Sequence, residues 1–156
     1  LARRLPGFAF VDGVAGFGEL GFAVTQAEAG DPIGDYRSTR GLWKRLGLAL
    51  VDGERQRRFT DPEKAAAHGY SPRRRAEVHA CIGEPLLRAQ WRGEREGVPA
   101  HPIGPYGEAY GTKRAEYVDR GWGPGHAHMA ALRYMTKLLI RDLRAAWRRE
   151  AAHGEK

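Results

Sequence analysis

Arginine and lysine side chains recur in clusters whose spacing is suited to binding the phosphates of a nucleic acid. Two clusters are short runs, and the third follows the last predicted helix at steps of three and four residues, which places its members on one helical face. The clusters comprise Arg55, Arg57 and Arg58; Arg73, Arg74 and Arg75; and Arg133, Lys137, Arg141, Arg144 and Arg148. Lys44 and Arg45, in an earlier predicted helix, add to them. Such clusters favour an electrostatic footprint for nucleic acid, and an ordinary solvated surface is the alternative.

A Gly-x-Gly turn that leads directly into a predicted helix is a further candidate contact for phosphate. Gly16, Gly18 and Gly21 allow backbone dihedrals that other residues avoid, and they let another backbone approach closely. The helix that follows would present unpaired N–H groups and the positive end of its dipole, which together suit an anion. No strand–helix–strand unit surrounds the turn, so dinucleotide binding is not supported. A tight turn between two packed helices is the other interpretation.

Ser71 is the candidate nucleophile, although its surroundings also fit a structural role. It precedes the arginines at 73–75, which could hold a phosphate, and His68 and Lys64 are near in sequence as activating partners. A serine in front of a predicted helix is equally a helix N-cap, which is the role predicted for Ser38. Both interpretations of Ser71 stay open.

His126 and His128 form a histidine-x-histidine pair of the kind that holds a metal ion in single-strand nickases. Tyr134 would then be the nucleophile, and His101 would supply a third ligand. Such a pair normally lies on a strand, whereas a helical pattern follows it here, so two histidines at a helix start are the alternative. Cysteine pairs, a P-loop and an HExxH motif are absent from the sequence, and we expect no metal site.

The elements that would position these residues are mostly helical in pattern. Helices are predicted over residues 22–29, 38–48, 62–67, 72–92, 106–119 and 126–151. Gly83 and Pro85 predict a kink in the fourth helix, and the turn Asp52-Gly53 predicts a hairpin or irregular loop over 48–59. The expected fold class is all-α: a helix-hairpin-helix-like helical domain with at most one short β-hairpin and a long C-terminal helix.

Glycine and proline content divides the chain into three parts. Residues 1–92 would form the helix-hairpin-helix-like domain, residues 93–125 a Gly/Pro-rich linker with a short helix, and residues 126–156 a basic amphipathic helix. One side of that last helix is apolar and should pack on the domain, leaving the basic side outward. The apolar residues are Leu132, Met135, Leu139, Leu143 and Trp147.

Composition places the chain among basic, globular proteins. It has 156 residues, of which 42% are hydrophobic and 29% charged, and 26 Lys plus Arg against 19 Asp plus Glu give a net charge of +7. This excess favours a polyanionic partner. Cys81 is the single cysteine, so we expect no internal disulfide and a reducing, cytoplasmic location. No apolar run approaches the roughly 20 residues that cross a bilayer, so we expect no membrane; the start at Leu1 indicates a fragment.

Three motifs follow one another in a recognisable order. The first is Gly16-Phe17-Gly18, the second is the end of a predicted helix at residues 27–31 (AEAGD), and the third is the stretch 42–49 (LWKRLGLA). This series resembles the C-terminal domain of the IS-one-ten class of insertion-sequence transposases. The resemblance covers residues 7–92 and, more loosely, residues 122–149.

The family continues with a basic, glycine-containing loop and a helix that carries a Leu-Arg signature. In this chain the loop would be residues 52–58 (DGERQRR). The helix would be the one that follows Ser71, or the last one with Leu132-Arg133. The family's serine usually lies in a Ser-Gly stretch after the Gly-Leu-Ala element, where this chain has Asp52-Gly53 instead, so the family's chemistry does not transfer whole.

The resemblance implies a role in DNA transposition and recombination. Such transposases are similar in having an N-terminal RuvC-like domain with four acidic metal ligands, and a C-terminal domain that contributes the serine and contacts DNA and a guide RNA. Mg²⁺ would therefore belong to a nuclease domain outside this chain, and we expect no cofactor here. The expected partners are DNA, a guide RNA and, in a homo-oligomer, a second copy of the chain.

Three functional hypotheses remain open on the sequence. The first is the DNA-binding domain of a transposase-like recombinase, without a complete catalytic site in this chain. The second is a non-catalytic helical adaptor of a phage or mobile element that binds nucleic acid or protein. The third is the metal-dependent nickase.

Overall fold

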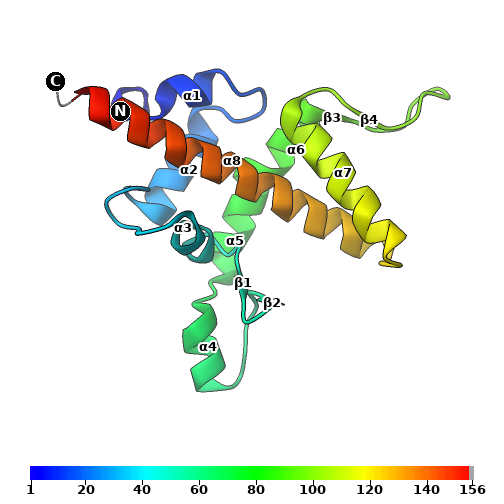
Figure 1. Ribbon diagram of the computed structural model, residues 1–156, viewed down its shortest axis with the longest axis horizontal. Coiled ribbons are helices and arrows are strands. Elements are labelled where there is room, and N and C mark those ends of the chain that lie inside the picture. Colours follow the sequence, from blue (N-terminus) through cyan, green and yellow to red (C-terminus); the bar gives the residue numbers. More distant parts are fainter. Residues whose placement is uncertain (155–156) are drawn as a thin grey trace.

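One long helix, α8 (Pro124–Gly154), crosses the whole molecule and contacts helices from both halves of the chain (Figure 1). The computed structural model describes residues 1–154, so the last two residues of the predicted C-terminal part lie outside the described range. The other helices are η1 (Ala2–Arg4), α1 (Phe8–Asp12), α2 (Glu19–Ala29), α3 (Thr39–Arg45), α4 (Pro62–His68), α5 (Pro72–Val78), the π-helical turn η2 (His79–Gly83), α6 (Glu84–Gln90) and α7 (Pro105–Asp119). The fold is mainly helical, as predicted. Among the described helices, none combines the length and the apolar character that a membrane span requires.

Two short antiparallel hairpins interrupt the helices, where the sequence predicted one at most. β1 (Leu50–Val51) pairs with β2 (Glu54–Arg55) around the predicted turn Asp52-Gly53, in which both residues have positive φ. The unexpected hairpin joins β3 (Trp91–Arg92) to β4 (His101–Pro102). It lacks the alternating apolar pattern by which strands are recognised, and it turns instead at Glu96-Gly97, again with positive φ at both residues.

Side-chain caps fix the starts of three helices at positions that the sequence indicates. Ser38 Oγ accepts a hydrogen bond from Gly41 N at 3.2 Å at the start of α3. Ser71 Oγ accepts one from Arg74 N at 3.3 Å at the start of α5, and Asp61 caps α4 in the same way. Each cap satisfies an N–H group that has no partner inside the helix. The predicted starts of these helices are therefore confirmed to within a residue.

The apolar side of α8 builds the centre of the core. The predicted core residues of this helix are all at most 7% exposed, and they pack against aromatic and aliphatic side chains of α1, α2, α3 and α7. At the C-terminal end of α8, Trp147 lies 6.1 Å from Phe22, ring centroid to ring centroid. Because a fully buried aromatic or aliphatic side chain stabilises the fold by about 1.5–3 kcal/mol, this stripe holds the termini and the middle of the chain together.

Arg144 departs from the predicted outward basic stripe of α8. Its side chain is buried: Nε donates to Pro32 O and Nη2 donates to Tyr36 O, both at 2.9 Å. The loop between α2 and α3 covers this part of the helix, which the helical periodicity of α8 alone does not reveal. Arg144 therefore ties that loop to α8 and is removed from the candidate nucleic-acid contacts.

The helix predicted over 72–92 is present up to Gln90 as α5, η2 and α6, with the π-helical turn next to the predicted kink, while residues 91–92 form β3 instead. Gly83 brings this rod against α8. A Cβ atom at Gly83 would lie 2.9 Å from Leu132 Cδ2 and 3.2 Å from Thr136 Oγ1, so a larger residue would push the two helices apart. The close crossing fixes where α5 stands relative to the middle of α8.

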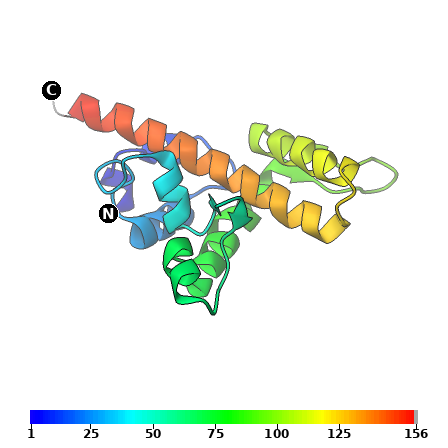
Figure 2. The same ribbon diagram turned by 60° about the horizontal axis from the view of Figure 1, so that its bottom comes forward.

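Residues 93–125 do more than link two parts of the molecule. α7 packs along α8 and contributes Tyr106 and Tyr110 to the core, with Tyr106 Oη donating to Asp142 Oδ2 at 2.7 Å. The β3–β4 hairpin extends from the start of α7 as an arm, away from β1 and β2 (Figures 1 and 2). The helix predicted over 106–119 is thus confirmed, and it is part of the packed fold.

Candidate nucleic-acid interface

A basic groove runs over β1, between α3 and the middle of α8. Three adjoining cavities are all lined by Leu50, and Arg40 and Lys137 each line two of them. Lys44 lines one of these cavities from α3, and Arg133 lines another from α8. We define the basic groove as the surface formed by these cavities. Its walls come from helices that are far apart in the sequence.

Specific contacts between α3, β1 and α8 hold the groove in shape. Trp43 Nε1 donates to the backbone carbonyl of Lys137 at 2.9 Å, which locks α3 against α8. The Lys137 ammonium lies 4.4 Å from the centroid of the same Trp43 ring, a cation–π contact that fixes its direction. Arg40 Nη2 donates to Leu50 O at 3.4 Å and so lies over β1. The groove is therefore a pre-formed feature of the fold.

Burial and mutual repulsion act on the same group of cations. Burial lowers the pKa of Arg133, and the nearby charge of Arg55 lowers it further. The pKa of Arg75 is lowered to about 10, first by burial and then by Arg133 and Arg55. The pKa of Lys137 is also lowered, first by burial and then by the charges of Arg133 and Arg40. Arg55 lies opposite Leu50 in the β1–β2 hairpin, and Arg75 Nη1 donates to Gly47 O at 2.8 Å. Both residues therefore lie beside the groove, and the cations there disfavour one another's charge.

The groove cations have no carboxylate partners. In the described part of the chain, no ion pair involves any of them, although ten pairs form elsewhere in residues 1–154. These cations are Arg40, Lys44, Arg55, Arg75, Arg133 and Lys137. Asp52 is the one acidic side chain that lines these cavities, and it forms no ion pair among residues 1–154, so an anion that enters the groove would meet an excess of positive charge.

The structure brings together one or more members of each predicted basic cluster. Lys44, Arg55, Arg75, Arg133 and Lys137 were predicted as contacts, and all lie in or beside the groove. Sequence reasoning missed Arg40. Its position four residues before Lys44, on the same helix, is the signal that could have found it, because residues four apart share a helical face.

Glu28 on α2 neutralises two of the predicted contacts. Arg73 Nη1 lies 2.9 Å from one carboxylate oxygen of Glu28, and Arg74 Nε lies 3.0 Å from the other. Arg45 Nε donates to the backbone carbonyl of Glu28 at 2.9 Å. The side chain of Glu28 is only 8% exposed, so this is a structural ion pair between α2 and α5. We therefore leave Arg73 and Arg74 out of the interface, whereas Arg45, which is exposed and forms no ion pair among the described residues, remains a predicted contact.

Other predicted cations are paired locally or stand free in solvent. Arg57 Nη2 lies 3.7 Å from Glu54 Oε2, and Arg141 Nε lies 2.8 Å from Asp142 Oδ1. Arg58 is exposed on the loop that leads to α4. Exposed pairs of this kind contribute little to stability, and they open readily when a stronger partner approaches. Arg57, Arg58 and Arg141 remain predicted contacts, and none of them lines the groove cavities.

The glycine turn before α2 faces mainly into the protein. A Cβ atom at Gly16 would lie 2.6 Å from Pro85 O, and one at Gly21 would lie 3.1 Å from Cys81 O. Gly18 is different, because nothing lies within 4 Å of the position of its Cβ. Gly16 and Gly21 thus let the turn pack against the rod formed by α5, η2 and α6. The phosphate contact predicted for this turn stays a prediction.

Ser71 has a structural hydrogen bond rather than an activating one. Its Oγ caps α5, and no side chain of the described residues accepts its proton. His68 is buried against the ring of Phe59, with centroids 4.4 Å apart, and Lys64 lies over the same ring. The residues that would have activated Ser71 are thus engaged elsewhere.

The histidine pair at the start of α8 also has structural partners. The His126 ring stacks on Trp122 at a centroid distance of 4.2 Å, and His128 Nδ1 lies 2.7 Å from Tyr110 Oη. His101 lies on β4, in the arm. Across residues 1–154, no three His, Cys, Asp or Glu side chains come together in a way that could hold a metal ion. The described geometry gives the nickase hypothesis no support.

Comparison with protein-family models, with curated proteins and with solved structures finds no match to this chain. The resemblance to insertion-sequence transposases therefore rests on the order of motifs in the sequence. The functional argument rests on the basic groove.

Proposed function

We propose that this chain binds nucleic acid and that the basic groove receives the sugar–phosphate backbone. The observation that carries the proposal is the convergence on one surface of cations from α3, β2, α5 and α8, none of which forms an ion pair among the described residues. Holding partly buried like charges together is unfavourable for the free protein. A polyanion relieves this repulsion, and its binding is driven further by the release of condensed counterions.

The shape of the groove favours a chain of phosphates over a single small anion. Its cations are spread along three adjoining cavities and do not surround one point. Successive phosphates of a strand could therefore each meet a different side chain. Contacts of this kind position a nucleic acid without reading its sequence.

Within this function we propose the DNA-binding domain of a transposase-like recombinase that acts in DNA transposition. The sequence resemblance over residues 7–92 supports it, since the family's basic loop corresponds here to residues 52–58, and Arg55 of that loop borders the groove. This narrower proposal includes a helix-hairpin-helix-like role for the turn before α2. It also names the partners, which are DNA, a guide RNA and a second copy of the chain. A non-catalytic adaptor of a mobile element is the second candidate. It is favoured by Ser71, which is engaged as a helix cap.

Titration of labelled duplex DNA and of structured RNA at several salt concentrations tests the proposal. The groove offers six cations, so the logarithm of duplex affinity should fall against the logarithm of salt concentration with a slope of roughly −5. The double variant Arg133→Gln/Lys137→Gln should bind at least about tenfold more weakly and lower that slope by about 2.

A charge-matched control lies on the arm. Arg92→Gln/Arg95→Gln removes the same charge from exposed positions away from the groove, and it should leave affinity within about twofold of the original at moderate salt. Equal losses in the two double variants would show that net charge alone drives binding and would overturn the groove. Binding that is absent at low salt would overturn the nucleic-acid function itself.

A further inference from the structure

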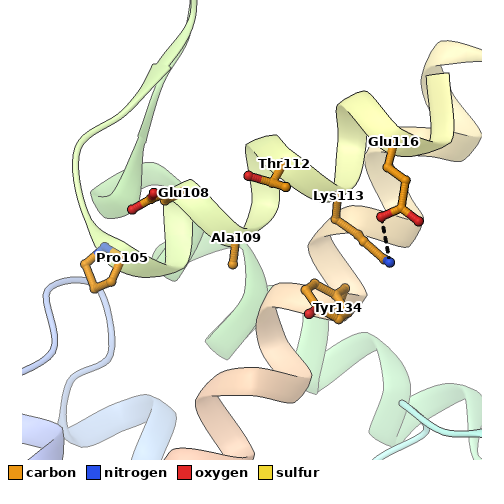
Figure 3. Close-up of a pocket in the computed structure, with 7 residues that line it drawn as sticks. All are labelled: Pro105, Glu108, Ala109, Thr112, Lys113, Glu116 and Tyr134. Atoms are coloured by element: carbon orange, nitrogen blue, oxygen red, sulfur yellow. Dashed lines mark hydrogen bonds and ion pairs between the residues drawn. The ribbon is translucent and has the colours of Figure 1, made fainter. Parts of the chain in front are cut away.

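A further cavity, separate from the three that form the basic groove, adjoins the groove at Tyr134. It opens between α7 and α8 and has a volume of about 340 Å³, which is within the range of small-ligand sites (Figure 3). Pro105 and Ala109 give it apolar surface, while Glu108 and Thr112 supply polar groups. We call it the side cavity. Tyr134 lines both the side cavity and the part of the groove that contains Arg133 and Lys137.

The side cavity is lined by two carboxylates, Glu108 and Glu116, against the single ammonium of Lys113, whereas the groove is basic. Glu108 is exposed and forms no ion pair within the described range. Glu116 lines the same cavity, and a hydrogen bond from Lys113 Nζ at 2.8 Å, shown in Figure 3, is the main cause that holds its pKa below the usual value. With a free carboxylate at Glu108, the cavity repels phosphate and attracts N–H donors.

Aromatic rings form the boundary between the two sites. The Lys113 ammonium lies 5.1 Å from the centroid of Tyr134 and 5.5 Å from that of Tyr117, and Tyr117 also lines the groove. A half-buried ring beside a phosphate-binding surface is the arrangement on which an unpaired base stacks. In a duplex the bases are stacked on one another and are not free to use it.

We propose that the side cavity receives one unpaired, amino-bearing base of a single-stranded nucleic acid whose phosphates lie in the basic groove. This inference rests on the proposed function. Tyr134 would stack on the base, and the Glu108 carboxylate would accept from its exocyclic amino group, as carboxylates do with the N4 amine of cytosine. Thymine and uracil present a carbonyl oxygen at that position, which a carboxylate repels. The site therefore selects single strands over duplexes and cytosine over thymine.

Affinities for short oligonucleotides of deoxycytidine and deoxythymidine, beside a mixed-sequence duplex, test this directly. The unaltered chain should bind the cytosine strand at least about fivefold more tightly than the thymine strand. Glu108→Gln should abolish that preference and leave duplex affinity unchanged. Glu63→Gln, which removes the same charge from exposed α4, should change neither.

Tyrosine variants test the stacking step separately. Tyr134→Phe keeps the ring and should keep the preference for single strands, while Tyr134→Leu should weaken single-strand binding about fivefold or more. A circular dichroism spectrum confirms that each variant is folded. Equal cytosine and thymine affinities, or a preference that survives both Glu108→Gln and Tyr134→Leu, would overturn the side cavity. These outcomes do not bear on the basic groove, because the groove is tested separately by the loss of duplex binding in Arg133→Gln/Lys137→Gln.

Discussion

Glu28 shows how a single buried carboxylate decides which arginines are free to bind a partner. Burial alone would raise its pKa, but hydrogen bonds from Arg74 and Arg73 outweigh burial, and the pKa is lowered from 4.5. Replacing it leaves two guanidinium groups without their acceptor between α2 and α5. We therefore expect Glu28→Gln to lower the free energy of unfolding by about 2 kcal/mol at neutral pH, measured by urea denaturation.

The pH dependence of that difference has a definite sign. A carboxyl group whose folded-state pKa lies below its unfolded value stabilises the fold above pH 4.5, and this contribution is lost as the pH falls through the folded-state value. The original chain and Glu28→Gln should therefore converge in stability on acidification below pH 4.5. Glu54→Gln, which breaks the exposed pair with Arg57, is the control and should cost less than about 0.5 kcal/mol. A Glu28→Gln deficit that persists undiminished in acid would contradict the ion-pair explanation.

The sequence predicts the roles of some individual residues well and the roles of others poorly. The cap role of Ser71 follows from local order alone, because the N-cap position is defined by its own neighbours. The same reasoning groups the arginines at 73–75, yet Glu28, more than forty positions away in the chain, takes Arg73 and Arg74 and leaves Arg75 beside the groove. Charge clusters can be read from sequence. Their pairing is a tertiary property, and it decides function.

At the scale of secondary-structure elements, the turn before α2 contains two glycines, Gly16 and Gly18, with different roles. Gly16 has a φ of +85° and would place a Cβ atom 2.6 Å from Pro85 O, whereas Gly18 has an ordinary φ and open space around it. We expect Gly16→Ala to lower the free energy of unfolding by about 2 kcal/mol or more, through backbone strain and forced separation of the turn from α6. Gly18→Ala should change it by less than about 1 kcal/mol.

Nucleic-acid binding by the same two variants bears on the phosphate contact predicted for this turn. A folded Gly18→Ala chain that binds duplex DNA as before would confine the interface to the groove. A loss of affinity without a loss of stability would instead return the start of α2 to the interface. Thermal unfolding monitored by circular dichroism, beside the duplex titration, separates the two outcomes.

Helices were predictable because their signals are local, and the exceptions lie where distant segments meet. The starts of α3 and α5 follow from Ser38 and Ser71, and the apolar stripe of α8 follows from its period. The arm escaped prediction because its pairing depends on turn geometry at Glu96-Gly97 and not on apolar alternation. Arg144 was misplaced because the loop that covers it lies more than a hundred positions away in sequence.

At the scale of the whole molecule, the groove exists because α8 gathers elements from both halves of the chain. Trp43 locks α3 to the middle of α8, and Gly83 lets η2 approach α8 closely. Arg40, Arg75 and Arg133 therefore lie along one surface although they are distant in sequence. No local pattern could have predicted this meeting. As a consequence, the folded chain, whose net charge is +7, holds several cations of the groove close enough to repel one another.

That repulsion should make the free protein less stable than it could be. We expect Arg133→Gln to raise the thermal midpoint by about 2–4 °C in dilute buffer, because it removes a partly buried cation that repels Arg55, Arg75 and Lys137. Sulfate, a divalent anion, should raise the midpoint of the original chain more than sodium chloride of equal ionic strength does. Arg133→Gln should lose most of that difference, which separates binding in the groove from the general effect of sulfate on burial. If the thermal midpoint falls in Arg133→Gln and sulfate still stabilises the variant more than sodium chloride does, Arg133 is held by favourable contacts. The groove cations would then not repel one another enough for a polyanion to relieve.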